Sequence, residues 1–195
     1  MPLPASAATA RSLLAAVRAH FGLRQATLAA YLGISPSLVA MADVNCRELP
    51  TAALQRLAPL GQALPPPWSN GLPTPSAPAP PVLPAPLPAL SDPPAPTPLR
   101  HRLLGCESAL LRATHALALA EHRAAQARRL LAVLPALAAT LPATDARARR
   151  QLPYMEANAR DHLAPGPTAV RALLTIRIVA LSHEVAWLRA WLPAG

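Results

Sequence analysis

Apolar residues recur at helical spacing through the first third of the chain and predict a compact domain of four or five short helices. The apolar positions of the first helix are Leu13, Leu14, Val17 and Phe21. We expect this helix to begin at about residue 10 and to end at Gly22, after a disordered lead over residues 1–9. Gln25 opens the second helix, a third follows it closely, and Thr51 is predicted to cap the fourth.

The junction between the second and third helices has a residue suited to each position of a tight turn. Gly33 can adopt the positive φ that the turn requires. Ser35 can cap the third helix, and Pro36 suits its first position, where a missing N–H costs nothing. The residues expected to form the buried seam are Leu28, Leu32, Ile34, Val39 and Ala42, with Ala29 allowing a close crossing. The pattern predicts a helix-turn-helix.

Residues 64–98 interrupt the helical pattern with proline. Fifteen of these 35 positions are proline, and Asp92 carries the only charge. Such a density excludes helix and sheet and favours extended polyproline II, which could span up to about 110 Å. The run VLPAPLP also suits a polyproline-binding partner, but we expect a plain spacer.

From residue 99 onward the chain is helical again, with apolar positions three and four residues apart. These positions are Leu103, Cys106, Leu110, Ala113, Leu117, Ala120, Ala124, Ala127, Leu131 and Leu134. Pro135 is expected to end or kink this helix. A second stripe runs through Leu174, Ile178, Leu181, Val185, Leu188 and Leu192. We expect the two heptad-like stripes to bury each other in an antiparallel hairpin, within one chain or across a dimer.

Between the two stripes, residues 144–163 predict a shorter, arginine-rich helix interrupted near Pro153, and Gly166 marks a fresh start. The predicted fold class is therefore all-α. Residues 10–63 form a small helix-turn-helix domain, residues 64–98 a proline-rich linker, and residues 99–193 a helical hairpin or coiled-coil bundle for association.

The charge favours polyanionic partners. The chain has 18 basic and 9 acidic residues, a net charge of +9, and every basic residue among the 18 is arginine. An arginine bias of this kind also follows from a GC-rich coding sequence, so it is not itself a sign of nucleic-acid contacts. Residues 10–63 carry +3 and residues from 99 onward +7, which leaves a modest charge on the helix-turn-helix.

Cys46 and Cys106 have neither pairing nor ligand spacing and suggest a reducing compartment. No apolar run is long enough to span a bilayer, so we expect a cytoplasmic protein without a membrane partner.

The histidines His115 and His122 lie seven residues apart, too far to share a metal ion. Neither a nucleophile with a base nor a phosphate-binding glycine loop is present, so we expect no enzyme, no metal and no cofactor.

The stretch from Gln25 through LAAYLGIS to RELP, at Arg47 to Pro50, resembles the Cro and phage-repressor family of helix-turn-helix domains, also called the XRE family. The resemblance covers about residues 10–63 and implies a lambda-repressor-like fold that binds double-stranded DNA. By this resemblance Gln25 meets a phosphate, Arg47 is placed for a further phosphate, and Arg24 or Arg18 could supplement it. The residues implied to face base edges are Ser35, Pro36, Ser37, Ala40 and Met41.

The implied reading surface departs from the family pattern. Pro36, Ala40 and Met41 cannot make bidentate hydrogen bonds to bases, so only Ser37 and Met41 could read sequence directly. We therefore expect a DNA-binding transcriptional regulator that depends on phosphate contacts and DNA shape, dimerising through residues 99–193. The alternative is a non-enzymatic adaptor that keeps the fold and binds a protein partner through its helical tail.

Overall fold

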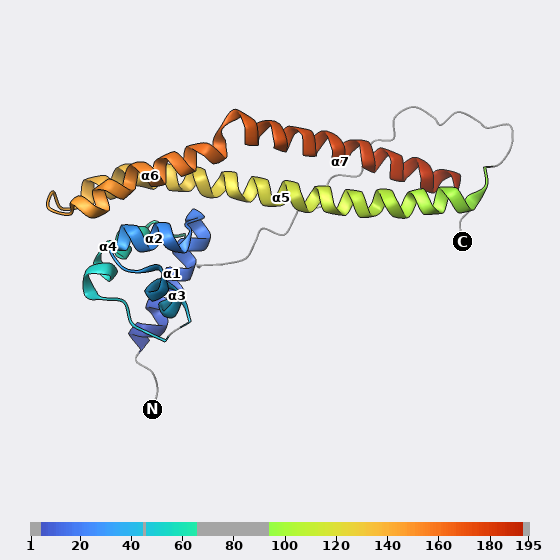
Figure 1. Ribbon diagram of the computed structural model, residues 1–195. Helices are drawn as coiled ribbons and strands as arrows, with labels where there is room; N and C mark the ends of the chain where they lie inside the picture. Colours follow the sequence, from blue (N-terminus) through green and yellow to red (C-terminus); the bar gives the residue numbers. More distant parts are fainter. Residues whose placement is uncertain (1–4, 45, 66–93, 193–195) are drawn as a thin grey trace. The chain divides into compact units, whose positions relative to one another are not determined.

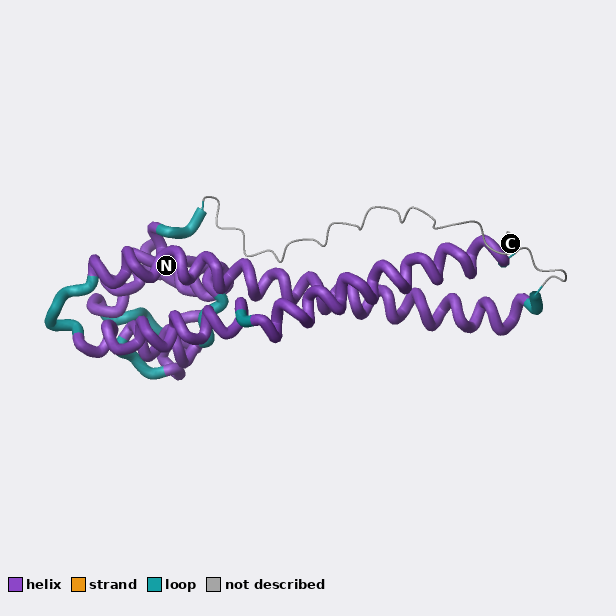
Figure 2. The backbone as a smooth tube through the Cα atoms, turned by 90° about the horizontal axis from the view of Figure 1, so that it is seen from above, coloured by secondary structure: helices purple, strands orange, loops and turns teal. Residues whose placement is uncertain are grey.

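A computed structural model describes residues 5–44, 46–65 and 94–192, and these residues form seven helices and no strand (Figures 1 and 2). The predicted all-α fold class is confirmed. The helices are α1 (Ala5–Phe21), α2 (Gln25–Leu32), α3 (Pro36–Asp43), α4 (Thr51–Gln62), α5 (Pro96–Thr140), α6 (Ala146–Leu163) and α7 (Pro165–Trp191). Within the described ranges no single helix is long and apolar enough to cross a membrane, although α2 and α3 together would pass on length and composition alone. Residues 66–93 of the predicted linker lie outside these ranges. The expectation that residues 96–98 are not helical is wrong, because α5 begins at Pro96, and proline is tolerated in a first helical turn, whose N–H groups have no helical partner.

The helix-turn-helix has the predicted local geometry. Gly33 has a φ of +79°, and the chain bends by 108° between α2 and α3. Ser35 caps α3 because its Oγ accepts the N–H of Leu38 at 3.2 Å, and Pro36 occupies the first helical position. A bend of 90–120° across a three- or four-residue turn is typical of helix-turn-helix motifs. Of the predicted seam only Ile34 is incompletely buried.

Two predictions about the ends of these helices are wrong. Helix α1 begins at Ala5, five residues earlier than expected, so residues 5–9 are not a disordered lead. Thr51 does not cap α4 but is its first residue, because the carbonyl of Pro50 already accepts the N–H groups of Ala53 and Leu54. Residue 45, just after α3, lies outside the described residues.

The chain divides into two compact units that differ from the predicted domains. The head unit consists, among described residues, of residues 5–65 and 123–164, and the hairpin unit of residues 94–122 and 165–192. Residues 123–164 were expected in the association domain. They join the head unit because Leu130, Leu134 and Leu137 of α5, with Met155 of α6, share one buried core with α1 to α4, in which α6 packs on α2.

Arg56 connects α4, α2 and α6 inside the head unit. Its Nε donates to Oδ2 of Asp145 at 2.6 Å, and its Nη1 donates to the carbonyl of Leu32 at 2.6 Å. Asp145 in turn caps α6, since its Oδ1 accepts the N–H of Ala148 at 3.1 Å. The hydroxyl of the fully buried Tyr31 donates to the Arg56 carbonyl at 3.3 Å. One guanidinium therefore satisfies the last carbonyl of α2 and holds the start of α6.

These contacts shift two pKa values. Burial alone would raise the pKa of Asp145. The hydrogen bonds from Arg56 and the Ala148 N–H, together with nearby positive charges, outweigh this effect and hold the pKa below its ordinary value. Burial, reinforced by the charge of Asp145, raises the pKa of Tyr31 to about 12. The native head unit thus favours an ionised Asp145 and a protonated Tyr31.

Two prolines lie inside helices that they were expected to interrupt. Helix α5 does not end at Pro135 but continues to Thr140, and α6 runs through Pro153 without a break. Each proline removes one N–H donor, so one carbonyl four residues earlier loses its helical partner. Both prolines are exposed, so solvent can satisfy that carbonyl, while the opposite helix faces remain packed in the core.

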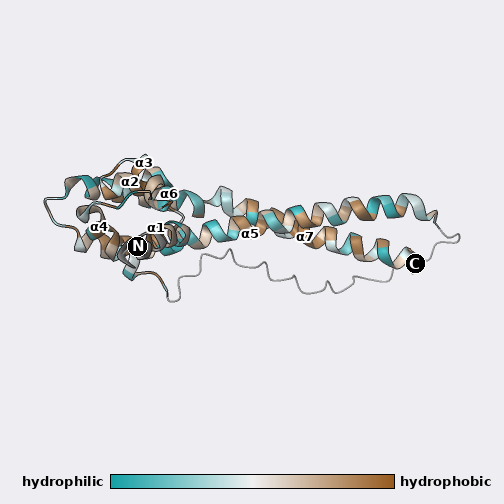
Figure 3. Cartoon of the chain, turned by 90° about the horizontal axis from the view of Figure 1, so that it is seen from below, coloured by the Kyte–Doolittle hydropathy of each residue, from teal (hydrophilic) through white to brown (hydrophobic). Residues whose placement is uncertain are grey.

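In the hairpin unit, α7 lies antiparallel to the first part of α5, within one chain (Figures 1 to 3). Cys106, Val185 and Leu188 form its buried core, with Leu99, Leu103 and Leu181 packed against it. Ion pairs of 2.6 Å join Arg102 to Glu184 and Arg189 to Glu107 beside this core. The single-chain arrangement of the predicted hairpin is therefore present, although part of the first stripe serves the head unit. Hydrophobic residues recur along both helices in Figure 3.

Candidate nucleic-acid interface

The first turn of α3 is the part of the predicted reading surface that solvent reaches most freely. Ser35, Pro36 and Ser37 are all exposed, and the two serine Oγ atoms lie 3.0 Å apart. Because a hydroxyl both donates and accepts, Ser37 keeps hydrogen-bonding capacity beyond this contact. The structure therefore brings the two predicted serines together at the start of α3.

Further along α3 the surface is apolar. Ala40 and Met41 are half-buried, and Val44, which caps the helix at its C-terminal end, is 65% exposed. Sequence reasoning did not include Val44 in the surface. The sequence feature that could have predicted Val44 is its spacing of four residues from Ala40, which itself follows Pro36 by four residues. This spacing places all three residues on one helical face. Contact with thymine methyl groups is the readout that such side chains offer.

Gln25, the predicted phosphate contact, is bonded within the protein. Its Nε2 donates to Oδ2 of Asp43 at 3.2 Å, and the same carboxylate forms an ion pair with Arg18. This cluster joins the start of α2, the end of α3 and α1. An amide nitrogen has two hydrogens, so Gln25 retains one donor for an outside acceptor. Arg18 neutralises Asp43 and so limits the repulsion that its carboxylate would exert on a phosphate.

The start of α2 adds donors beside Gln25. Arg24, the N-cap residue, is exposed and makes no side-chain capping bond, so no capping side chain occupies the first N–H groups of α2. Such N–H groups, at the positive end of a helix, are suited to phosphate. Arg47, between α3 and α4, is also exposed. Arg24 and Arg47 are thus accessible as phosphate contacts, whereas Arg18 and Arg56 are engaged inside the unit.

The head unit gathers most of the positive charge of the chain. Residues 1–72 and 123–164 together hold 12 arginines and 5 acidic residues, a net charge of +7 out of +9. The sequence had suggested +3 for the helix-turn-helix, with the remainder on a separate tail. The net charge of the unit that carries the candidate interface is higher than expected because α6 and the last part of α5 belong to the same unit.

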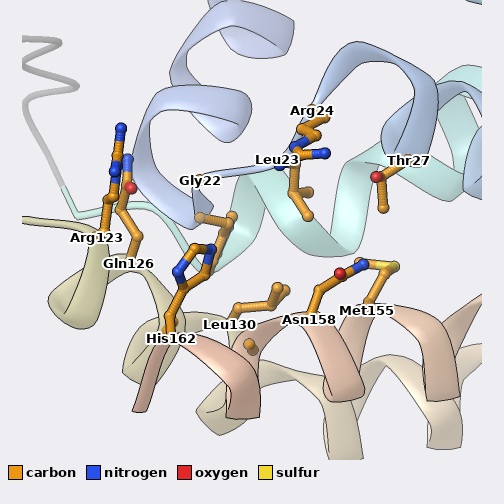
Figure 4. A pocket seen from close by; sticks show the side chains of 13 residues that line it. Gly22, Leu23, Arg24, Thr27, Arg123, Gln126, Leu130, Met155, Asn158 and His162 are labelled. Atoms are coloured by element: carbon orange, nitrogen blue, oxygen red, sulfur yellow. The ribbon is translucent and has the colours of Figure 1, made fainter. Parts of the chain in front are cut away.

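A pocket of about 320 Å³ opens beside the start of α2 (Figure 4). The α1–α2 turn forms one wall, and Gly22 has a φ of +66° there; a Cβ at this position would lie 2.8 Å from Oε1 of Gln126. The Nε2 of Gln126 donates to the carbonyl of Ala19 at 2.6 Å, and Arg129 donates to the carbonyl of His20 at 3.3 Å. These bonds fix the turn against α5. No local pattern predicts this pocket, because its walls lie about a hundred residues apart in the chain.

Among the described residues, no group of three or more histidine, cysteine or acidic side chains could hold a metal ion. Cys46 is exposed and Cys106 is buried, and both are free thiols; burial raises the pKa of Cys106. The Cys106 thiol lies beside Glu184 and Arg102, which also interact with it.

Comparison with known proteins found no matching family model, no matching curated protein and no matching solved structure. The function proposed below therefore rests on the geometry of α2 and α3 and on the charge of the head unit.

Proposed function

We propose that this chain is a DNA-binding transcriptional regulator with a helix-turn-helix of the Cro and phage-repressor type. The observation that carries the proposal is the geometry of α2 and α3. A three-residue turn with Gly33 at positive φ, a Ser35 cap and a bend of 108° leaves the first turn of α3 exposed. This arrangement suits insertion of the start of α3 into the major groove.

Binding would depend mainly on the phosphate backbone. Arg24, Arg47 and the free amide hydrogen of Gln25 are the proposed phosphate contacts, supported by the net charge of +7 on the head unit. Ser37 and Met41 are the proposed base contacts, and Val44 extends the apolar surface. With one hydroxyl as the main polar reader, much of the sequence preference would come from DNA shape. The free thiols accord with action in the cytoplasm.

Binding of the full chain to random genomic duplex fragments, followed by sequencing of the retained DNA, tests this proposal. We expect salt-dependent retention and enrichment of particular sequences. Arg47→Ala should weaken binding to all sequences about fivefold and reduce the salt slope by about one, whereas Ser37→Ala should change the preferred sequence. Arg100→Ala, an exposed arginine of the hairpin unit, is the matched control. The proposal is contradicted if the retained DNA shows neither salt-dependent binding nor enrichment of particular sequences.

The hairpin unit favours self-association as a second property. Of ten exposed large hydrophobic residues in the described chain, seven lie in this unit, and α7 contributes Val170, Leu173, Ile176 and Val179, all at least half exposed. A helix that is apolar around its circumference is normally buried. A second copy of the hairpin would cover this face, and a dimer would present two reading helices to paired half-sites.

Light scattering on the full chain tests the dimer. We expect twice the chain mass for the natural sequence and a monomer for the double variant Leu173→Glu with Ile176→Glu. Ala190→Glu, an exposed position on the same helix, should leave the dimer intact. A monomeric natural chain contradicts the dimer. If the chain also retains no DNA, the adaptor with a different protein partner becomes the better account of the apolar face.

A further inference from the structure

The pocket beside the α1–α2 turn has features of a ligand site, and of its lining residues the DNA-binding proposal uses only Arg24. Its walls come from the α1–α2 turn, from α5 and from α6, all within the head unit. In Figure 4 Leu130, Met155, Asn158 and His162 lie on the lower helices, and Gly22, Leu23, Arg24 and Thr27 lie above them. The site is therefore assembled from three segments of the chain that only the folded head unit brings together.

Its lining combines cationic and amide groups with an apolar base. Arg24, Arg123 and His162 bring ionisable nitrogen groups, and Gln126, Asn158 and Thr27 bring neutral polar groups. The side chains that form the apolar part are Phe21, Leu23, Ala127, Leu130, Met155 and Ala159. None of the lining residues is acidic. Without a carboxylate in the wall, the arginines favour an anion, and the amides can donate to its oxygens.

The apolar residues limit what the rest of the ligand can be. Met155 is fully buried, and Leu130 and Ala159 are at most 4% exposed, so the base is part of the hydrophobic core. A volume of about 320 Å³ lies at the lower end of the range of about 300–1,000 Å³ for small-molecule sites. The space suits one charged head and a short apolar body, not a nucleotide or a long lipid chain.

We propose that this pocket binds a small amphipathic carboxylate, with its head at Arg123 beside Gln126 and its apolar body against Leu130 and Met155. The fixed turn supports a preformed site, because Gln126 of α5 bonds to the carbonyl of Ala19 and Gly22 lets the turn lie close to the Gln126 side chain. The inference does not depend on DNA binding, since it rests on the lining of the pocket alone.

Methyl NMR of the full chain, labelled at its methionine methyl groups, provides a local readout. Met155 lies at the base of the pocket, whereas Met41 lies on α3 and reports on a different surface. Octanoate is the probe, because it joins a carboxylate to a short apolar chain. We expect saturable movement of the Met155 signal, assigned with Met155→Leu, and little movement of the Met41 signal. Octylammonium, with the opposite charge, and acetate, without the tail, should produce no saturable movement.

Two arginine variants test the assignment of the head group. Arg123→Gln should weaken octanoate binding about fivefold, whereas Arg128→Gln should not change it, because Arg128 is exposed on the same helix and does not line the pocket. Three results would overturn the proposal: a stationary Met155 signal, equal responses to octanoate and octylammonium, or equal affinities for the natural chain and Arg123→Gln. Loss of DNA binding alone would not affect it.

Discussion

Replacing Arg56 by glutamine is expected to lower the free energy of unfolding of the head unit by about 2–3 kcal/mol. The substitution leaves the carbonyl of Leu32 and the carboxylate of Asp145 without the guanidinium that now bonds both at 2.6 Å. Removing one partner of a fully buried pair costs about 3–5 kcal/mol, and the 25% exposure of the Arg56 side chain reduces that value.

Urea unfolding followed through the methyl signal of Met155 measures this loss inside the head unit. Arg128→Gln removes an exposed arginine from the same unit and should change stability by less than about 0.5 kcal/mol. Equal midpoints for the two variants would show that Arg56 does not hold α6 in place.

The same pair makes the head unit sensitive to acid. Because the pKa of Asp145 is lower in the folded state than in the unfolded state, its contribution is complete above the unfolded pKa. The contribution is lost as pH falls through the folded pKa, below the ordinary value of 3.8. In Arg56→Gln the contribution of Asp145 to the free energy of unfolding should be smaller. The natural chain and the variant should therefore become similar in stability at low pH.

Replacing Gly33 by alanine is the second substitution for which we expect a large effect, a loss of about 2–3 kcal/mol. A residue with a Cβ is strained at a φ of +79°, and that Cβ would lie 2.5 Å from Nη1 of Arg56. The alanine therefore strains the turn and displaces the guanidinium from the carbonyl of Leu32. Urea unfolding through the Met155 signal again measures the loss.

Gly105→Ala is the matched control for this substitution. Gly105 lies within α5, and a Cβ added there meets nothing within 4 Å, so alanine should be neutral or stabilising by up to about 1 kcal/mol. The double variant Gly33→Ala with Arg56→Gln should lose less than the sum of the single losses, because both substitutions disturb the same contact. Strict additivity would indicate that Gly33 acts through backbone strain alone.

The helix-turn-helix could be predicted because its determinants are local. Gly33, Ser35 and Pro36 each meet a requirement that neighbouring residues impose, namely a positive φ, a free N–H to cap and a first helical position. Backbone geometry of this kind depends on few residues. The DNA contacts assigned by resemblance stay predictions, and the structure adds that Gln25 is already bonded to Asp43.

The composition of the head unit could not be predicted, because its determinants are distant. Arg56 and Asp145 lie 89 residues apart, and nothing near either residue in the sequence indicates the other. The heptad pattern of α5 is continuous, yet Cys106 packs in the hairpin unit and Leu134 in the head unit. Periodicity identifies the buried face of a helix but not its partner. The pocket and the charge of +7 depend on the same distant packing.

The union of residues 123–164 with the first four helices has a consequence for synthesis. At about 5–20 residues per second, the ribosome needs roughly 5–20 s to proceed from the end of α4 to the end of α6. During that interval the face of α2 that α6 will cover has no native partner, and the guanidinium of Arg56 can bond to the carbonyl of Leu32 but not yet to Asp145. The nascent helix-turn-helix is therefore exposed to chaperones and proteases until α6 emerges, and chains released early would lack part of their core.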